Sequence, residues 1–107
     1  MLDYRLFLDD IREPVGSDWL IARSYDDAVK IIKTLGIPRN ISLDHDLGTD
    51  KTGYDLAKFI IEYDQDHNEI DNTFVFKVHS ANPVGAKNIE CILNNYIKFK
   101  NEKLPEV

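Results

Sequence analysis

The chain has 107 residues, which is enough for one compact domain and too few for two. Thirteen Lys and Arg residues against nineteen Asp and Glu residues give a net charge of −6, without a long basic block. This balance argues against binding along a nucleic-acid backbone, because such binding depends on a basic surface. The composition, 43% hydrophobic and 30% charged with five Gly and four Pro, excludes disordered, collagen-like and coiled-coil chains.

The sequence pattern predicts neither a membrane span nor a signal peptide. Uninterrupted apolar runs reach only four residues, as at 19–22, whereas a membrane span needs roughly 20. The first ten residues, MLDYRLFLDD, carry acids where a signal peptide would be basic and then apolar. A single cysteine, Cys91, excludes an internal disulfide, and its position in a helical apolar pattern predicts a small buried side chain. We therefore expect a cytoplasmic protein with no membrane association, and the sequence leaves its oligomeric state open.

Hydrophobic periodicity predicts four short strands and three amphipathic helices. The strands are expected at residues 6–8, 19–22, 41–43 and 74–78. The helices are expected after the N-cap residues Ser24, Thr52 and Asn82, ending near residues 35, 63 and 99. Residues 100–107 then form a tail.

This order of elements predicts an α/β protein, a three-layer sandwich with a short, mostly parallel, four-stranded sheet and a single domain over residues 1–107. Lys77 in the fourth strand indicates that this strand lies at an edge of the sheet. The connection from Asp10 to Trp19 is too short for a usual parallel crossover. An irregular crossover must therefore replace the first helix of such a fold.

Polar clusters follow three of the predicted strands directly. They are Asp9-Asp10, Asp44-His45-Asp46 and His79-Ser80. The carboxyl ends of parallel strands line one edge of an open sheet, where ligands bind. We therefore expect these side chains to converge around one crevice.

The acids of these clusters repel one another at neutral pH unless they bind a cation, share protons or point into water. A divalent cation such as Mg²⁺ is the simplest resolution, and Asp9, Asp10 and Asp44 are its candidate ligands. The alternative is that Asp10 and Asp46 only cap turns.

Two histidines, His45 and His79, come from different strand ends and can supply one base and one acid near neutral pH. Alternatively, both are structural imidazoles held by hydrogen bonds. Ser80 and Asn82, at a predicted helix start, together with Arg12 suit the binding of a phosphate. In the alternative interpretation Asn82 is only an N-cap and Arg12 forms an ion pair with the neighbouring acids.

With these residues the chain resembles the cyclic-phosphate processing receiver-like domains, a branch of the receiver-like superfamily. The matching segments are LFLDDIREP at 6–14, DWLIARSYDDAV at 18–29, SLDHDLG at 42–48, TGYDLA at 52–57 and VHSANPVGAKNI at 78–89. The resemblance implies a truncated receiver-like, flavodoxin-like fold with sheet order 2-1-3-4. It also implies action on cyclic phosphates at RNA ends in repair or conflict systems.

In phosphoacceptor receivers, Asp9 and Asp10 would correspond to the acid pair, Asp44 to the acceptor and Ser80 to the hydroxyl position. The chain differs from them in lacking a fifth strand with its lysine and a first helix, and in carrying His45 and His79. These differences argue against phosphotransfer signalling.

Two classes of function follow. The first is a hydrolase, a phosphoesterase that opens 2′,3′-cyclic phosphate RNA ends or related cyclic nucleotides. Its catalytic residues would be His45, His79, Asp44 and Asp46, with Arg12, Ser80 and Asn82 binding the phosphate. The second is a non-catalytic module that captures a cyclic nucleotide or a partner protein, or a degenerate receiver domain.

Overall fold

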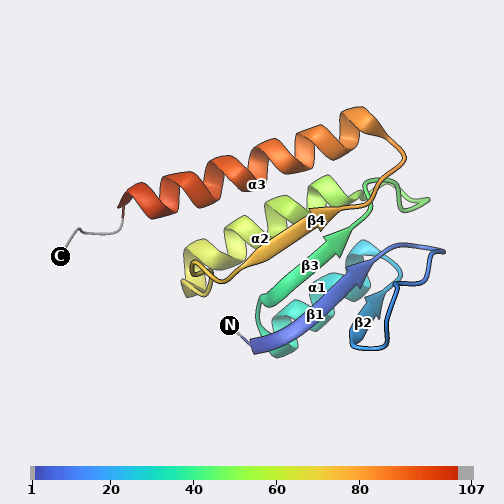
Figure 1. The fold of residues 1–107 in the computed structure, drawn as a ribbon, viewed down its shortest axis with the longest axis horizontal. Helices are drawn as coiled ribbons and strands as arrows, with labels where there is room; N and C mark the ends of the chain where they lie inside the picture. Colours follow the sequence, from blue (N-terminus) through green and yellow to red (C-terminus); the bar gives the residue numbers. More distant parts are fainter. Residues whose placement is uncertain (1, 104–107) are drawn as a thin grey trace.

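The structure is a computed structural model that describes residues 2–103. Its sheet contains β1 (Leu2–Leu8), β2 (Trp19–Ala22), β3 (Pro38–Leu43) and β4 (Val75–Val78). All three strand pairings are parallel, and the order is β2-β1-β3-β4 (Figure 1). The helices are α1 (Tyr25–Leu35), α2 (Gly53–His67) and α3 (Pro83–Lys103). The predicted α/β class and the sheet order 2-1-3-4 are confirmed, and β4 lies at an edge as Lys77 indicated.

The predicted helix starts are confirmed, whereas two helices are longer than expected. Ser24 caps α1, and Thr52 caps α2 in a reciprocal capping box with Asp55. Helix α2 runs on to His67, and α3 runs to Lys103. The first four residues of the expected tail are therefore helical, and the remaining part, 104–107, lies outside the described residues.

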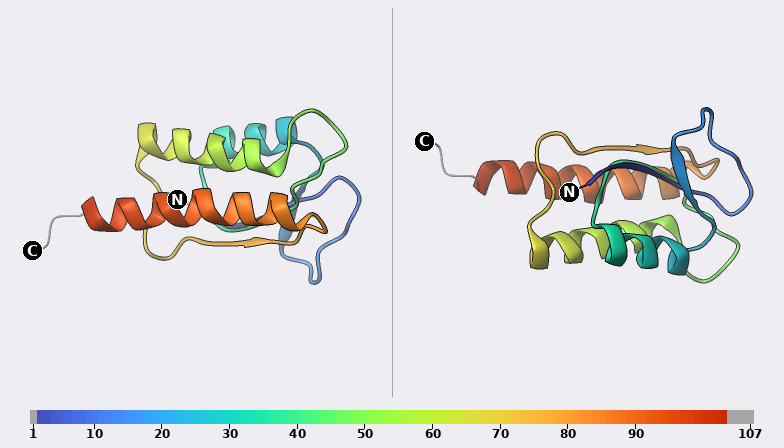
Figure 2. Two further views of the ribbon diagram at one scale, coloured as in Figure 1. Left: turned by 90° about the horizontal axis from the view of Figure 1, so that it is seen from above. Right: turned by 90° about the horizontal axis from the view of Figure 1, so that it is seen from below.

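The helices lie on one side of the sheet. Helices α1 and α2 cover one face, and α3 runs along the β4 edge against α2 (Figure 2). The side chains that point from the strands toward these helices form the buried core with them, and they include Leu6, Leu8, Ile41 and Leu43. The alternate residues of the strands point to the opposite face, which none of the described helices covers. The structure differs here from the expected three layers, because the short β1–β2 connection contains no helix to place on that face.

The β1–β2 connection is held by a side chain that the sequence analysis did not single out. Arg23, just after β2, donates from one guanidinium nitrogen to the carbonyl oxygens of Asp9, at 3.2 Å, and Arg12, at 2.6 Å. Its other nitrogen forms an ion pair with Glu13. Arg23 thus holds the loop at Asp9, Arg12 and Glu13. This connection is stabilised by one arginine side chain and contains no helix.

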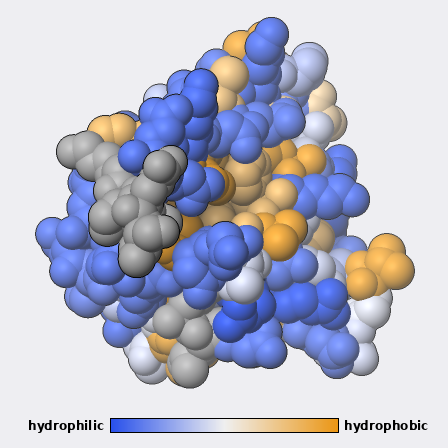
Figure 3. Space-filling view, turned by 60° about the vertical axis from the view of Figure 1, so that its left-hand side comes forward, coloured by the Kyte–Doolittle hydropathy of each residue, from blue (hydrophilic) through white to orange (hydrophobic). Residues whose placement is uncertain are grey.

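One burial prediction is wrong. Cys91 is exposed, because the buried side of α3 is formed by Ile89 and Leu93 and the residue midway between them points away from the core. The surface is otherwise largely hydrophilic, with an apolar patch in the view of Figure 3. Among residues 2–103, no helix has the length and apolarity needed to cross a membrane.

Candidate functional site

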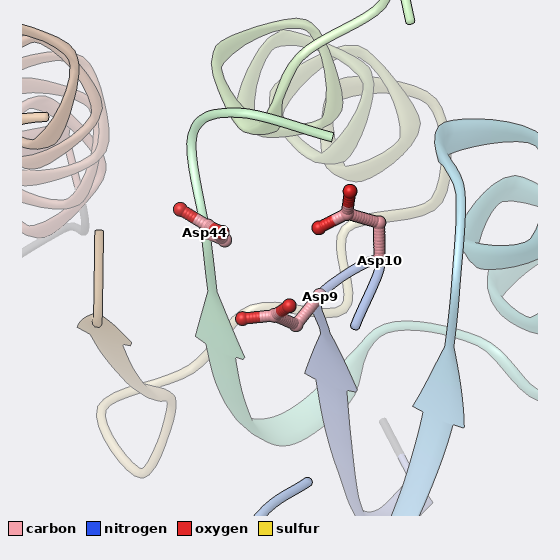
Figure 4. A group of neighbouring side chains, drawn as sticks. All are labelled: Asp9, Asp10 and Asp44. Carbon is pink, nitrogen blue, oxygen red and sulfur yellow. The ribbon is translucent and has the colours of Figure 1, made fainter. Parts of the chain in front are cut away.

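Three carboxylates meet at the carboxyl edge of the sheet. Leu8 and Leu43 are partners in the β1–β3 pairing, so the residues that follow them leave the sheet side by side. One oxygen each of Asp9, Asp10 and Asp44 lies within 4.8 Å of the others (Figure 4). Asp9 and Asp44 are buried, and Asp10 is half-buried. The structure thus brings together the three acids expected to bind a cation.

Asp9 is fixed by hydrogen bonds to both of its oxygens. Its Oδ1 accepts from the backbone N–H groups of Ile11, at 3.0 Å, and Arg12, at 2.8 Å. Its Oδ2 lies 3.0 Å from Nε2 of His79. Burial alone would raise the pKa of Asp9, but the two backbone donors and His79 together lower it below its ordinary value. Asp9 is therefore an ionised carboxylate that is held in one position.

His79 has protein partners at both ring nitrogens. Nε2 faces Asp9, Nδ1 lies 2.7 Å from Oγ of Ser42, and the ring stacks on Phe7 with centroids 4.5 Å apart. The sequence analysis expected this histidine to act as a catalytic acid or base. In this arrangement neither nitrogen is free for a substrate, and the geometry instead positions Asp9.

His45 has a different environment. Its Nδ1 lies 2.8 Å from Oδ1 of Asp46, whereas its Nε2 has no hydrogen-bond partner among the described residues. The hydrogen bond from His45, with a further one from Asn82, lowers the pKa of Asp46. A carboxylate at Nδ1 favours the tautomer with its proton there, which leaves Nε2 as a base. The carboxylate that holds the His45 ring is therefore that of Asp46.

Gly85, near the start of α3, makes room for the His45 ring. A Cβ atom at this position would lie 2.4 Å from Cγ of His45, so any side chain here would displace the imidazole. The N–H of Gly85 donates to Oδ1 of Asn82 at 3.0 Å, which is an N-cap bond. Only the tertiary structure shows this close approach of Gly85 to His45.

The three expected phosphate-binding residues lie along the same edge, each with a partner in the protein. Ser80 Oγ accepts from the N–H of Asn82 at 3.0 Å, which tightens the turn before α3. Arg12 donates from one guanidinium nitrogen to the carbonyl oxygen of His79 at 3.0 Å and is otherwise exposed. Arg12 forms no ion pair with Asp9 or Asp10, so the alternative interpretation of this residue does not hold. Its remaining N–H groups stay available to an anion.

The donor set at the carboxylate cluster suits a hard divalent cation. Carboxylate oxygens are the ligands that Mg²⁺ and Ca²⁺ prefer. No Lys or Arg side chain forms an ion pair with Asp10 or Asp44 in the part of the chain that the structure describes. Three clustered carboxylates, two of which have no ion pair among the described residues, fit a bound metal ion, which would relieve their repulsion.

Comparison with known families agrees with this geometry. Residues 4–95 match the family described as Cyclic-phosphate processing Receiver domain, which covers most of the chain. The chain belongs to this family. No curated protein and no solved structure matches it.

Within this cyclic-phosphate processing receiver domain, two site residues escaped the sequence analysis. The sequence pattern placed Ser42 only within a predicted strand. A buried hydroxyl in a strand needs a hydrogen-bond partner, and the partner of Ser42 is His79. Gly53, the first residue of α2, allows the backbone of Asp44 to approach, because a Cβ atom there would lie 2.0 Å from the Asp44 carbonyl oxygen. Together, Gly53 and Gly85 let the starts of α2 and α3 close around residues 44–46.

Proposed function

We propose that this domain is a phosphoesterase that hydrolyses 2′,3′-cyclic phosphates, as on RNA ends that await repair or on cyclic nucleotides. One juxtaposition supports the proposal. The His45–Asp46 pair, with Nε2 of His45 unpartnered within the described residues, directly follows Asp44 of the carboxylate cluster in the chain. A base, and beside it carboxylates that would hold a charge-neutralising cation, are two elements that hydrolysis of a phosphodiester uses.

The reaction assigns a separate task to each group. Nε2 of His45 takes a proton from a water molecule as the water oxygen attacks phosphorus. The bond between phosphorus and one ribose oxygen then breaks, and the departing alkoxide takes a proton from solvent, which leaves a phosphomonoester. Arg12 donates to a phosphoryl oxygen through its remaining N–H groups. A Mg²⁺ ion held by Asp9, Asp10 and Asp44 would neutralise charge on the phosphoryl oxygens.

His79 is a positioning residue in this proposal. Its hydrogen bond to Asp9 keeps that carboxylate ionised and in one orientation. Its hydrogen bond to Ser42 fixes the orientation of the His79 ring. The proposed reaction therefore uses His45 as its one histidine base, where the sequence had predicted a base and an acid from His45 and His79, since both nitrogens of His79 are engaged.

The engagement of His79 also favours a second candidate function. With one available histidine nitrogen instead of two, the site can capture a cyclic nucleotide without opening it. Binding would then depend on the same Arg12 and carboxylate cluster, but no linear product would form.

Hydrolysis of adenosine 2′,3′-cyclic phosphate in the presence of Mg²⁺, followed by ³¹P NMR, separates these candidates. We expect a phosphomonoester product and a loss of rate of about 100- to 10,000-fold in His45→Ala. His67→Ala is the matched control, because His67 is an exposed histidine at the end of α2. Binding by calorimetry without product over long incubation would overturn the hydrolase and leave the binding module. A rate that is equal in His45→Ala and His67→Ala would overturn the role of His45.

A further inference from the structure

The sheet face without helices carries a groove beside the proposed catalytic edge. The groove has a volume of about 460 Å³, in the range of small-molecule sites. Its floor and walls come from all four strands and from the β1–β2 loop, with Phe7, Trp19, Asn40, Ser42, Val75, Lys77, Arg12 and Val15 among the lining residues. In Figure 1 this face of the sheet is turned toward the viewer, and no helix crosses it.

The groove and the carboxylate cluster share a wall. His79 lines the groove, binds Asp9 of the cluster and stacks on Phe7 of the groove floor. Arg12 also lines the groove, and it is tethered to the carbonyl oxygen of His79. A ligand with its phosphate at the strand ends can therefore extend directly into the groove.

The chemistry of the lining suits an aromatic, hydrogen-bonding group with an anion attached. Trp19 is half-buried and packs edge-on against Phe7, with ring centroids 5.9 Å apart. Asn40 adds an amide that both donates and accepts, as recognition of a base edge requires. Val75, 55% exposed on β4, is an apolar side chain that nothing in residues 2–103 buries.

The charge of the groove differs from that of the whole molecule. The chain carries a net charge of −6, yet Arg12 and Lys77 both line this groove. The one acid among the lining residues, Glu13, is paired with Arg23. Lys77 forms no ion pair with any described residue. The groove is thus a locally basic, partly aromatic site on an acidic protein.

From these observations we infer that the groove binds the nucleobase of the nucleotide whose cyclic phosphate lies at the carboxyl edge. The inference rests on the proposed function and adds to it a binding site for the base of the 2′,3′-cyclic phosphate substrate. The volume of the groove is sufficient for one nucleoside.

Binding in the groove can be followed by tryptophan fluorescence, because Trp19 is the only tryptophan of the chain. We expect adenosine 2′,3′-cyclic phosphate to quench the Trp19 fluorescence in the presence of Mg²⁺. Methyl riboside 2′,3′-cyclic phosphate, which lacks a base, should bind roughly tenfold more weakly and cause no quenching, since base stacking on aromatic side chains accounts for that order of affinity.

A charge reversal in the groove gives the second measurement. Lys77→Glu should weaken binding of the adenosine probe about tenfold and leave the affinity for the base-free probe unchanged. Lys98→Glu is the matched control, because Lys98 is an exposed lysine of α3 that does not line the groove.

The outcomes separate this inference from the proposed function. Equal affinities for the two probes, with unchanged Trp19 fluorescence, would overturn the base site, and hydrolysis of both probes would then still support the phosphoesterase. Quenching by the adenosine probe without any hydrolysis would support the base site and overturn the phosphoesterase. A dimer in sedimentation velocity that Lys77→Glu dissociates would make the groove a contact between two copies and would also overturn the base site.

Discussion

Oδ2 of Asp9 lies 3.0 Å from Nε2 of His79, although the two residues are 70 positions apart in the sequence. The same imidazole reaches Ser42 on β3 through Nδ1. The ends of β1, β3 and β4 are therefore joined by one hydrogen-bonded chain, with the buried carboxylate of the cluster at its end. This chain also connects the carboxylate cluster with the open face of the sheet, since His79 belongs to both.

His79→Ala should destabilise the domain by about 2 kcal/mol, because a buried carboxylate loses a charge-assisted hydrogen bond and Ser42 loses its partner. Urea unfolding at pH 7 measures this change. His67→Ala should stay within about 0.5 kcal/mol of the parent, as an exposed substitution does. Equal stabilities of the two variants would contradict the positioning role of His79.

The same variant should change the acid stability of the domain. The pKa of Asp9 is lower in the folded than in the unfolded chain, so its ionisation stabilises the fold above the unfolded pKa. That contribution is lost as the pH falls through the folded pKa. Without His79 the folded pKa rises, and His79→Ala should lose the contribution at a higher pH than the parent. Unfolding free energies measured between pH 7 and pH 3 test this order.

Mg²⁺ should stabilise the folded domain with a dissociation constant in about the millimolar range or tighter. At 100 times the dissociation constant, binding adds about 2.7 kcal/mol to the free energy of unfolding, and a chelator removes it. Asp10→Asn should abolish this gain without destabilising the metal-free protein, because Asp10 makes no hydrogen bond to a described residue. Thermal unfolding with Mg²⁺ or with EDTA provides the test, and an unchanged Mg²⁺ effect in the variant would exclude Asp10 as a ligand.

Gly85→Ala should impair turnover while the domain stays folded. The added Cβ would lie 2.4 Å from Cγ of His45, so the imidazole must shift from the position in which it contacts Asp46. Overpacking costs about 1–3 kcal/mol, and the better helix propensity of Ala returns up to about 1 kcal/mol. Val84→Ala, an exposed neighbour on the same helix turn, is the control. Activity equal to the parent in Gly85→Ala would show that the position of the His45 ring does not matter for the reaction.

Asp64 anchors the far end of the domain. It is buried in α2, where its Oδ1 accepts from the N–H groups of Glu69 and Ile70 and its Oδ2 from Tyr96 and Lys100, each at 2.6 Å. Asp64→Asn should cost about 3 kcal/mol, because Lys100 loses its buried partner. Asp66→Asn, at an exposed site of the same helix, should cost far less.

The pH dependence of the Asp64 variant has a defined sign. Burial opposes ionisation of Asp64, but hydrogen bonds from the Ile70 backbone, Lys100 and Tyr96 outweigh it and lower the pKa. The ionised side chain thus stabilises the fold above the unfolded pKa, and this contribution disappears as the pH falls through the folded value. The difference in unfolding free energy between parent and Asp64→Asn should therefore shrink below about pH 4. A constant difference down to acid pH would contradict the ion pair.

Local features were determined by the sequence itself. Strand β2 at 19–22 and the caps Ser24 and Thr52 follow from short-range pattern and hydrogen-bonding chemistry, and all three were confirmed. The meeting of Asp9, Asp10 and Asp44 could also be expected, because parallel strands place their carboxyl ends at one edge.

The tertiary structure alone decided the partners of these side chains. The sequence gives no sign that His79 is occupied on both nitrogens while Nε2 of His45 has no partner within residues 2–103, that Gly85 lies against His45, or that Cys91 is exposed. The sequence pattern also predicted helices on both faces of the sheet, whereas the described helices lie on one side. The physical reason is that a motif specifies residue types at a strand end, whereas a hydrogen bond depends on positions to within a few tenths of an ångström. Those positions are set by the packing of strands and helices that are distant in the chain.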